Sequence, residues 1–463
     1  MRSFKQILCR VLAGVVFLSV QGFSESFKEL NFEKQFSNAN AMVVSSRKKN
    51  KNTPFNLYVL EGKEKGATLL VIGGIHGDEP GSYFAPSLLA QYYTIKKGNV
   101  LVVPNLNPDS IMAFRRGVYK DMNRKFAVIA KDDPDFDNVQ RIKEIIKDSK
   151  VDFVINLHDG HGFYREKWEN SIFNPKAWGQ TYVIDQKTLD NVPFGDLDKI
   201  AKQMEGRLNQ ILHYDFHTFG VRNTETKFKD EEQQNSLTFF ATTHLKPALA
   251  IETSKNIKEL PLKTLYQLSS IEVLMEILGI EFERSFDLNL ENVTGKIDDF
   301  GSVKINDNIT LELSGIKNSL NFIPLLKEEN SFVFTNPIAG VKKVKDGFEL
   351  YAGYKKATHL RADIFPMDCK MQSLGVELDG REVQAKAGDV LEFRENFLIK
   401  GQENARVNVI GYSKKGLASE HNIVLTPKMM DKNYTLDKAG RIFRVEWYEG
   451  ENFCGMLNLC VKE

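Results

Sequence analysis

The chain has 463 residues, more than one hydrophobic core usually serves, so two or three domains are expected, and 42% hydrophobic residues suffice to build their cores. The 62 lysines and arginines nearly balance the 61 aspartates and glutamates. This balance excludes the broad basic surface with which proteins bind nucleic acid or an anionic membrane.

The first 24 residues have the pattern of a secretory signal peptide. Three basic residues and no acidic residue precede an apolar stretch from Val11 to Val20, and small residues follow at Gly22 and Ser24. The apolar stretch is too short to span a bilayer comfortably, and Cys9 precedes it, which is the wrong side for a lipid attachment site. We therefore predict a cleavable signal peptide over residues 1–24 and export of the mature protein.

Residues 25–285 have the alternating pattern of an α/β domain. Aliphatic runs typical of buried strands occupy residues 67–74, 151–157 and 247–251. A helical stripe of apolar side chains between Leu265 and Leu278 stops at Gly279, a residue type that is common just after a helix ends. We expect a mixed, mainly parallel sheet flanked by helices.

Beyond residue 285 the pattern becomes β-rich. Short stretches such as residues 309–313 and 443–447 alternate apolar and polar side chains, and turn signals such as Asp379-Gly380 separate them. We predict a small β-rich domain over residues 286–345 and a β-sandwich-like domain over residues 346–463.

Three cysteines follow the predicted signal peptide, namely Cys369, Cys454 and Cys460. At most one disulfide can form among them. Cys454 and Cys460 are close enough in sequence to pair, and burial of both as small apolar side chains is an equally good alternative.

Polar residues follow the three predicted strands at their carboxyl ends. His76 and Glu79 come directly after the first strand, His158 ends the second and Glu252 follows the third. Ligands of open α/β sheets bind at the carboxyl ends of parallel strands, so these side chains are expected to converge. Catalytic zinc sites use three imidazole or carboxylate ligands and leave a fourth position for water. Each residue alone is more often structural, but together His76, Glu79 and His158 predict a metal site.

A basic loop follows the next strand, which ends near Pro104. It contains Asn107-Pro108-Asp109 and, further on, the run from Arg115 to Phe126. The planar fork of an arginine matches a carboxylate, so this loop could bind the terminal carboxylate of a substrate beside the metal. An ordinary basic surface loop is the alternative.

These motifs stand in the order found in zinc metallocarboxypeptidases of the carboxypeptidase A type, which the chain resembles over roughly residues 40–280. The matching motifs are His76-x-x-Glu79, Asn107-Pro108-Asp109, Arg116, Asn123-Arg124, Leu157-His158 and Ile251-Glu252. The resemblance is closest to the secreted peptidoglycan DL-carboxypeptidases that determine helical cell shape in curved and spiral Gram-negative bacteria. It extends to Leu157-His158-Asp159-Gly160, Gly162-Phe163-Tyr164-Arg165 and the β-rich C-terminal half.

The resemblance implies a metallocarboxypeptidase-like fold and a role for each matching residue. Zinc would be held by His76, Glu79 and His158. Glu252 would be the general base, and Arg116 would stabilise the developing oxyanion. Asn123 and Arg124 would bind the carboxylate of the leaving residue. Arg116 is chosen over its neighbour Arg115 by its spacing to Asn123.

The implied activity is that of a periplasmic enzyme that trims peptidoglycan and thereby influences helical cell shape. It would cleave uncrosslinked muropeptide tripeptide stems between the γ-carbonyl of D-glutamate and meso-diaminopimelate, leaving dipeptides. The C-terminal domains could bind other wall or cell-shape proteins. Two alternatives stay open: a deacylase of the succinylglutamate desuccinylase or aspartoacylase type, and a non-catalytic envelope protein that binds peptidoglycan.

Overall fold

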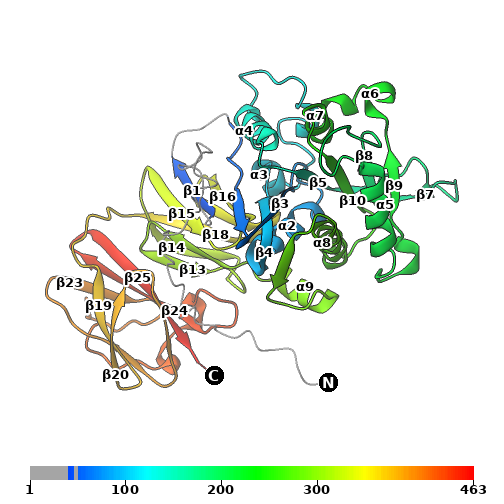
Figure 1. The fold of residues 1–463 in the computed structure, drawn as a ribbon. Helices are drawn as coiled ribbons and strands as arrows, with labels where there is room; N and C mark the ends of the chain where they lie inside the picture. Colours follow the sequence, from blue (N-terminus) through cyan, green and yellow to red (C-terminus); the bar gives the residue numbers. More distant parts are fainter. Residues whose placement is uncertain (1–39, 46–50, 463) are drawn as a thin grey trace.

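The computed structural model describes residues 40–45 and 51–462, so the predicted signal peptide lies outside the described residues. The chain forms three regions that follow one another in space (Figure 1). We call them the α/β domain (residues 51–298), the middle β module (residues 40–45 and 299–366) and the C-terminal β module (residues 367–462). No helix within the described ranges is both long enough and apolar enough to cross a membrane.

One eight-stranded sheet forms the centre of the α/β domain, in the order β11-β4-β3-β5-β10-β8-β9, with β2 paired to β4. Its strands are β2 (Tyr58–Glu61), β3 (Glu64–Ile72), β4 (Tyr93–Val103), β5 (Phe153–Gly160), β8 (Thr181–Ile184), β9 (Gly220–Asn223), β10 (Ala248–Ser254) and β11 (Glu281–Arg284). The central strands β4, β3, β5 and β10 run parallel, whereas β2 and β11 lie antiparallel on β4 and β8 lies antiparallel on β10. The prediction of a mixed, mainly parallel sheet is confirmed.

Helices cover both faces of this sheet. They are α2 (Gly81–Tyr92), α3 (Pro108–Met112), α4 (Phe136–Lys147), α5 (Leu197–Leu208), α6 (Thr226–Lys229), α7 (Leu237–Thr243), α8 (Leu260–Ile277) and α9 (Leu290–Ile297), with short 3-10 turns η1 (Met122–Arg124), η2 (Asp215–His217) and η3 (Gln233–Asn235). Leu69 and Val71 of β3 join the core under α2, α5 and α8, whereas Leu70 and Ile72 join the core under α4 and α7. Successive residues of a strand face opposite sides, so a strand buried on both sides is apolar throughout.

Four smaller sheets form the two β modules. In the middle module β1 (Asn40–Ser45), β15 (Glu329–Phe334), β12 (Ser302–Ile305) and β13 (Ile309–Glu312) face β14 (Ser319–Leu325), β18 (Lys355–Ile364), β17 (Gly347–Ala352) and β16 (Ala339–Val344) across one core. In the C-terminal module β20 (Arg381–Lys386), β19 (Ser373–Leu378) and β22 (Phe397–Ile399) face β21 (Val390–Phe393), β25 (Asn452–Val461), β24 (Ile442–Glu449) and β23 (Ala405–Val409). The turns η4 (Pro427–Met429) and η5 (Lys432–Tyr434) precede β24. The prediction of a β-rich C-terminal half is confirmed.

Two strand pairings bear on the predicted division into domains. Strand β1 comes before the α/β domain in sequence but pairs antiparallel with β15 of the middle module. The predicted boundary at residue 345 falls in the turn between β16 and β17, which pair with each other. The division into domains stays a prediction, but a cut at residue 345 would separate two hydrogen-bonded strands.

A disulfide joins Cys454 to Cys369, 85 residues away, with 5.2 Å between their Cα atoms. The suggested pairing of Cys454 with Cys460 is wrong. Both residues lie on β25, six positions apart, and a strand rises about 3.3 Å per residue, so their Cα atoms are about 20 Å apart. A disulfide needs Cα atoms within about 7 Å. Cys460 is buried. The alternative, in which both cysteines are small apolar side chains outside any disulfide, is also wrong, because Cys454 is disulfide-bonded.

Candidate active site

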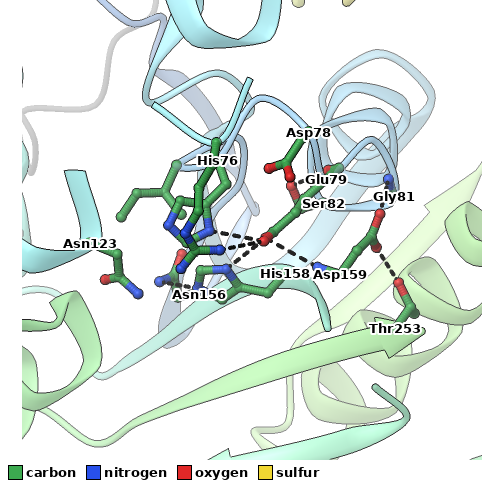
Figure 2. A network of polar contacts seen from close by, with 12 residues as sticks. His76, Asp78, Glu79, Gly81, Ser82, Asn123, Asn156, His158, Asp159 and Thr253 are labelled. Atoms are coloured by element: carbon green, nitrogen blue, oxygen red, sulfur yellow. Dashed lines mark hydrogen bonds and ion pairs between the residues drawn. The ribbon is translucent and has the colours of Figure 1, made fainter. Parts of the chain in front are cut away.

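The site lies where three neighbouring parallel strands end. The loop after β3 carries His76 and Glu79, and the chain then enters α2 at Gly81. His158 lies near the end of β5, and Glu252 lies opposite it on β10. Figure 2 shows the contacts of both histidines with the Glu79 carboxylate. The predicted convergence of these residues at one edge of the sheet is what the structure shows.

Three buried side chains point their ligand atoms at one another. Nδ1 of His76 lies 3.0 Å from Oε1 of Glu79, and Nδ1 of His158 lies 2.9 Å from Oε2 of the same carboxylate. Each residue offers one metal-ligand atom, a ring nitrogen or a carboxylate oxygen, and these three atoms lie within 4.8 Å of one another. The predicted ligand residues His76, Glu79 and His158 therefore form one cluster.

The other ring nitrogen of each histidine also has a polar partner. Nε2 of His76 lies 2.9 Å from Oδ1 of Asp121, and Nε2 of His158 lies 2.8 Å from the Asn156 side-chain amide. A carboxylate or carbonyl behind the ring is the usual arrangement for a metal-binding histidine, because it keeps the proton on the far nitrogen.

The donor set fits a divalent metal ion. Two imidazoles and one carboxylate are the ligands that catalytic zinc takes, and Asp121 would keep the proton on Nε2 of His76 when Nδ1 binds the ion. Within the described residues the buried Oδ1 of Asn156 has no hydrogen-bond partner. A half turn of that amide would let the oxygen accept from Nε2 of His158, which carries the proton when Nδ1 faces a cation.

The protonation of the cluster follows from burial and charge. Burial acts to raise the pKa of Glu79, but the charge of His76 and hydrogen bonds from both histidines hold this pKa well below its ordinary range. Burial lowers the pKa of His158. In His76 the lowering by burial is outweighed by Glu79 and Asp121, which raise the pKa to about 9. Glu79 is thus an anion, the form in which a carboxylate binds metal.

Glu252 is the second carboxylate of the site. It pairs in register with His158 on β5 and with Thr181 on β8. Burial, followed by the nearby charge of Glu79, raises its pKa well above the ordinary range of a glutamate. Upward shifts of this kind are common among carboxylates that transfer protons in active sites.

The basic loop reaches the cluster through Arg116. Its Nη1 lies 3.2 Å from Oε1 of Glu79, and its Nε and Nη2 both lie 3.0 Å from Oδ2 of Asp121. The backbone N–H of Gly77 donates to the carbonyl of Arg115 at 2.9 Å. A side chain at position 77 would collide with the carbonyl of Ser110, so glycine allows the two loops to approach closely. The side chain of Arg116 is therefore the one that faces the cluster.

Asn123 and Arg124 follow in the short turn η1, which the Asp121 side chain caps at the Asn123 N–H. Oδ1 of Asn123 accepts from the backbone N–H of Leu237 at the start of α7. The Arg124 guanidinium donates to Glu232 at 2.9 Å. Both residues share one turn with Asp121, but in this structure their side chains bind protein groups on the α7 side and not the histidine cluster.

Four residues around the cluster were given no role from the sequence. Asp121 bonds both His76 and Arg116. Lys255 binds Asp78 at 2.8 Å and lies 3.5 Å from Glu79. Asp159 donates its N–H to Glu79, while its carboxylate accepts from the Gly81 N–H and pairs with the buried Lys263. Asp121 had a signal, since it stands two residues before Asn123-Arg124, whereas nothing in the sequence marks Lys255 or Lys263.

The fold and this cluster define a metallocarboxypeptidase, and the comparisons agree. The family model described as "carboxypeptidase controlling helical cell shape catalytic" matches residues 40–298, and that for the "C-terminal domain of metallo-carboxypeptidase" matches residues 367–462. The chain belongs to this family of carboxypeptidases that control helical cell shape. The family predicted from the residues is confirmed, as is an enzyme with peptidase activity, and a bound metal is implied.

Solved structures of one relative are similar over nearly the whole chain. The cell shape determinant protein Csd4 from Helicobacter pylori, in apo and in tripeptide-bound form, is 33% identical over 88% of this chain and 100% of its own, with a TM-score of 0.83. Its form with mDAP bound, described as a D,L-carboxypeptidase, is 34% identical over 86% of this chain and 97% of its own, with a TM-score of 0.81. No curated protein sequence matches the chain.

Proposed function

We propose that this protein is a zinc-dependent peptidoglycan DL-carboxypeptidase. It removes meso-diaminopimelate from the uncrosslinked tripeptide stem of muropeptides by hydrolysing the bond to the γ-carbonyl of D-glutamate, and the dipeptide stem remains. Family membership supports this proposal, as do the relative's tripeptide-bound and mDAP-bound structures. The observation that carries it is the convergence of His76, Glu79 and His158 opposite Glu252.

His76, Glu79 and His158 would hold the zinc ion. When bound, the ion polarises the scissile carbonyl and lowers the pKa of a water molecule. The other contributions come from the chain itself. Asp121 behind His76 and the Asp159 N–H on Glu79 hold two of the three ligands in place.

Glu252 is the general base. Its carboxylate accepts the proton of the attacking water and donates it to the leaving amine of diaminopimelate. A carboxylate with the ordinary pKa of a glutamate is a weak base, so it would accept the proton of the water poorly, although it would release that proton readily. Burial next to Glu79 raises the pKa of Glu252, which makes its carboxylate a better base for the proton of the water.

The cationic side chains determine where the substrate is cut. Arg116 stabilises the developing oxyanion. Its guanidinium lies beside Glu79, one of the proposed zinc ligands, and is therefore close to the place where the scissile carbonyl would bind. Asn123 and Arg124 bind the carboxylate of the leaving residue, for which Arg124 exchanges its contact with Glu232. Recognition of a terminal carboxylate makes the enzyme an exopeptidase.

The periplasm is the compartment in which this activity is needed. Residues 1–24 have the pattern of an export signal, and the disulfide between Cys369 and Cys454 suits an oxidising compartment. Export to the periplasm would bring the enzyme to its substrate, the peptide stems of peptidoglycan. Binding of other wall or cell-shape proteins by the β modules stays a prediction.

The test is mass spectrometry of purified disaccharide tripeptide, tetrapeptide and pentapeptide after incubation with the mature protein. We expect loss of diaminopimelate from the tripeptide, abolition by a chelator and restoration by zinc. Glu252→Gln should abolish cleavage, whereas Glu144→Gln on the exposed side of α4 should not.

The other outcomes separate the alternatives. Removal of terminal D-alanine would keep the mechanism and change the substrate. Absence of cleavage by zinc-loaded protein would contradict the proposal and favour a deacylase or a binding protein. A cellular effect on shape that survives Glu252→Gln would point to the binding protein.

A further inference from the structure

The turn between β17 and β18 of the middle module lies against the α/β domain. Ala352 pairs with Lys355, so Gly353 and Tyr354 form a two-residue turn, and Gly353 has a φ of 58°, which favours glycine. A Cβ at Gly353 would lie 3.1 Å from the Tyr83 ring and 3.3 Å from the Phe84 ring. The turn is therefore pressed closely against α2.

Tyr354 contacts two aromatic rings of the α/β domain. Its ring centroid lies 4.6 Å from that of Phe114, at an interplanar angle of 34°, and 6.4 Å from that of Phe84, edge to face at 87°. Aromatic pairs at such separations attract each other beyond the area that they bury. Tyr354 thus joins Phe84 and Phe114, which are 30 positions apart in sequence.

These two rings belong to the segments that carry the active-site residues. Phe84 lies in the first half of α2, which begins two residues after Glu79. Phe114 lies two residues before Arg116 and has a φ of 49°, a left-handed conformation that an aromatic residue adopts only where its surroundings support it. A second contact supports the same loop, because Gly340 of β16 leaves room for the Met112 side chain.

We propose that Tyr354 is a positioning residue of the active site, which holds the Phe114 turn so that Arg116 faces Glu79. The middle β module then completes the catalytic unit and is not a separate binding module. The inference rests on the proposed role of Arg116. It predicts a defect in the chemical step, because an oxyanion contact is made chiefly in the transition state.

The experiment measures kcat and KM for the muropeptide tripeptide with zinc-loaded full-length variants. Tyr354→Ala should lower kcat about 10-fold or more and leave KM within about twofold, since small misplacements of catalytic groups have effects of this size. Tyr354→Phe, which keeps the ring, should restore most of the activity, and Phe114→Ala should repeat the defect. Lys355→Gln is the matched control, because it removes the ion pair with Asp298 across the same interface and does not touch Phe114.

A double variant separates positioning from stability. In an Arg116→Ala background Tyr354→Ala should cause no further loss, because the two changes remove one interaction. The inference would be overturned if Tyr354→Ala lowered kcat equally in the Arg116→Ala background. It would also be overturned if Lys355→Gln lowered kcat to the same extent and both variants had a lowered thermal midpoint. Wild-type kcat in Tyr354→Ala would also overturn it. Full activity of Arg116→Ala alone would contradict the proposed mechanism, and the inference would fall with it.

Discussion

Asp121 connects the metal cluster with Arg116, and its two carboxylate oxygens have different tasks. Oδ1 lies 2.9 Å from Nε2 of His76 and accepts from the Asn123 N–H at 2.9 Å. Among the residues that the structure describes, Oδ2 accepts hydrogen bonds only from the Arg116 guanidinium, at 3.0 Å. An asparagine at position 121 could keep the oxygen for His76 and Asn123 and would then turn its NH2 group towards Arg116. Asp121→Asn should therefore release Arg116 while the fold of the turn stays intact.

The size of the effect follows from these contacts. Loss of the negative charge behind His76 should weaken metal binding about 10- to 100-fold, or about 1.4 to 2.7 kcal/mol, as for other residues that orient a metal ligand. Two donor groups facing each other at Arg116 should in addition lower kcat at saturating zinc about 10-fold or more. Competition with a chromophoric chelator measures the first effect, and tripeptide hydrolysis measures the second.

Arg116→Ala is the matched variant for the second effect. It should lower kcat as Asp121→Asn does, but it should leave zinc affinity close to that of the wild type. If Asp121→Asn binds zinc as tightly as the wild type and turns over at the wild-type rate, then Asp121 neither supports His76 nor directs Arg116. The contacts of Asp121 with His76 and Arg116 would then have no part in metal binding or catalysis.

Three further predictions concern stability. Burial raises the pKa of Asp185 to about 6, so the folded state holds this proton more tightly than the unfolded state. The contribution of this group to the free energy of unfolding should therefore be fully present below about pH 4 and be lost as the pH rises through 6. Asp185→Asn should abolish this slope, and thermal midpoints of about equal pH dependence in both proteins would contradict it. The double variant Cys369→Ser, Cys454→Ser opens a loop of 85 residues, which should lower the free energy of unfolding by about 4 to 5 kcal/mol on the loop-entropy estimate. Denaturant unfolding measures this loss, and tripeptide hydrolysis at 25 °C should stay unchanged. Lys125→Met should cost about 3 to 5 kcal/mol, because it leaves the fully buried Asp135 without its cation, and adding Asp135→Asn should restore part of the loss in the same assay.

Local patterns in the sequence determined the α/β domain and the candidate metal ligands. Strand and helix periods are visible along the chain, and parallel strands bring their carboxyl ends to one edge, so the order of His76, Glu79, His158 and Glu252 was enough to predict that they meet. The choice of Arg116 over Arg115 rested on spacing alone, and the ion pair with Glu79 agrees with it.

Only the tertiary structure decided the contacts between segments that are distant in sequence. Strand β1 pairs with a strand almost 300 residues away, Cys454 reaches Cys369 and not the nearer Cys460, and Tyr354 meets Phe114 across two regions. Periodicity describes which face of an element is buried but not which other element covers it. That choice depends on the packing of whole faces against one another, and therefore the role of the β modules beside the active site could not be read from the sequence.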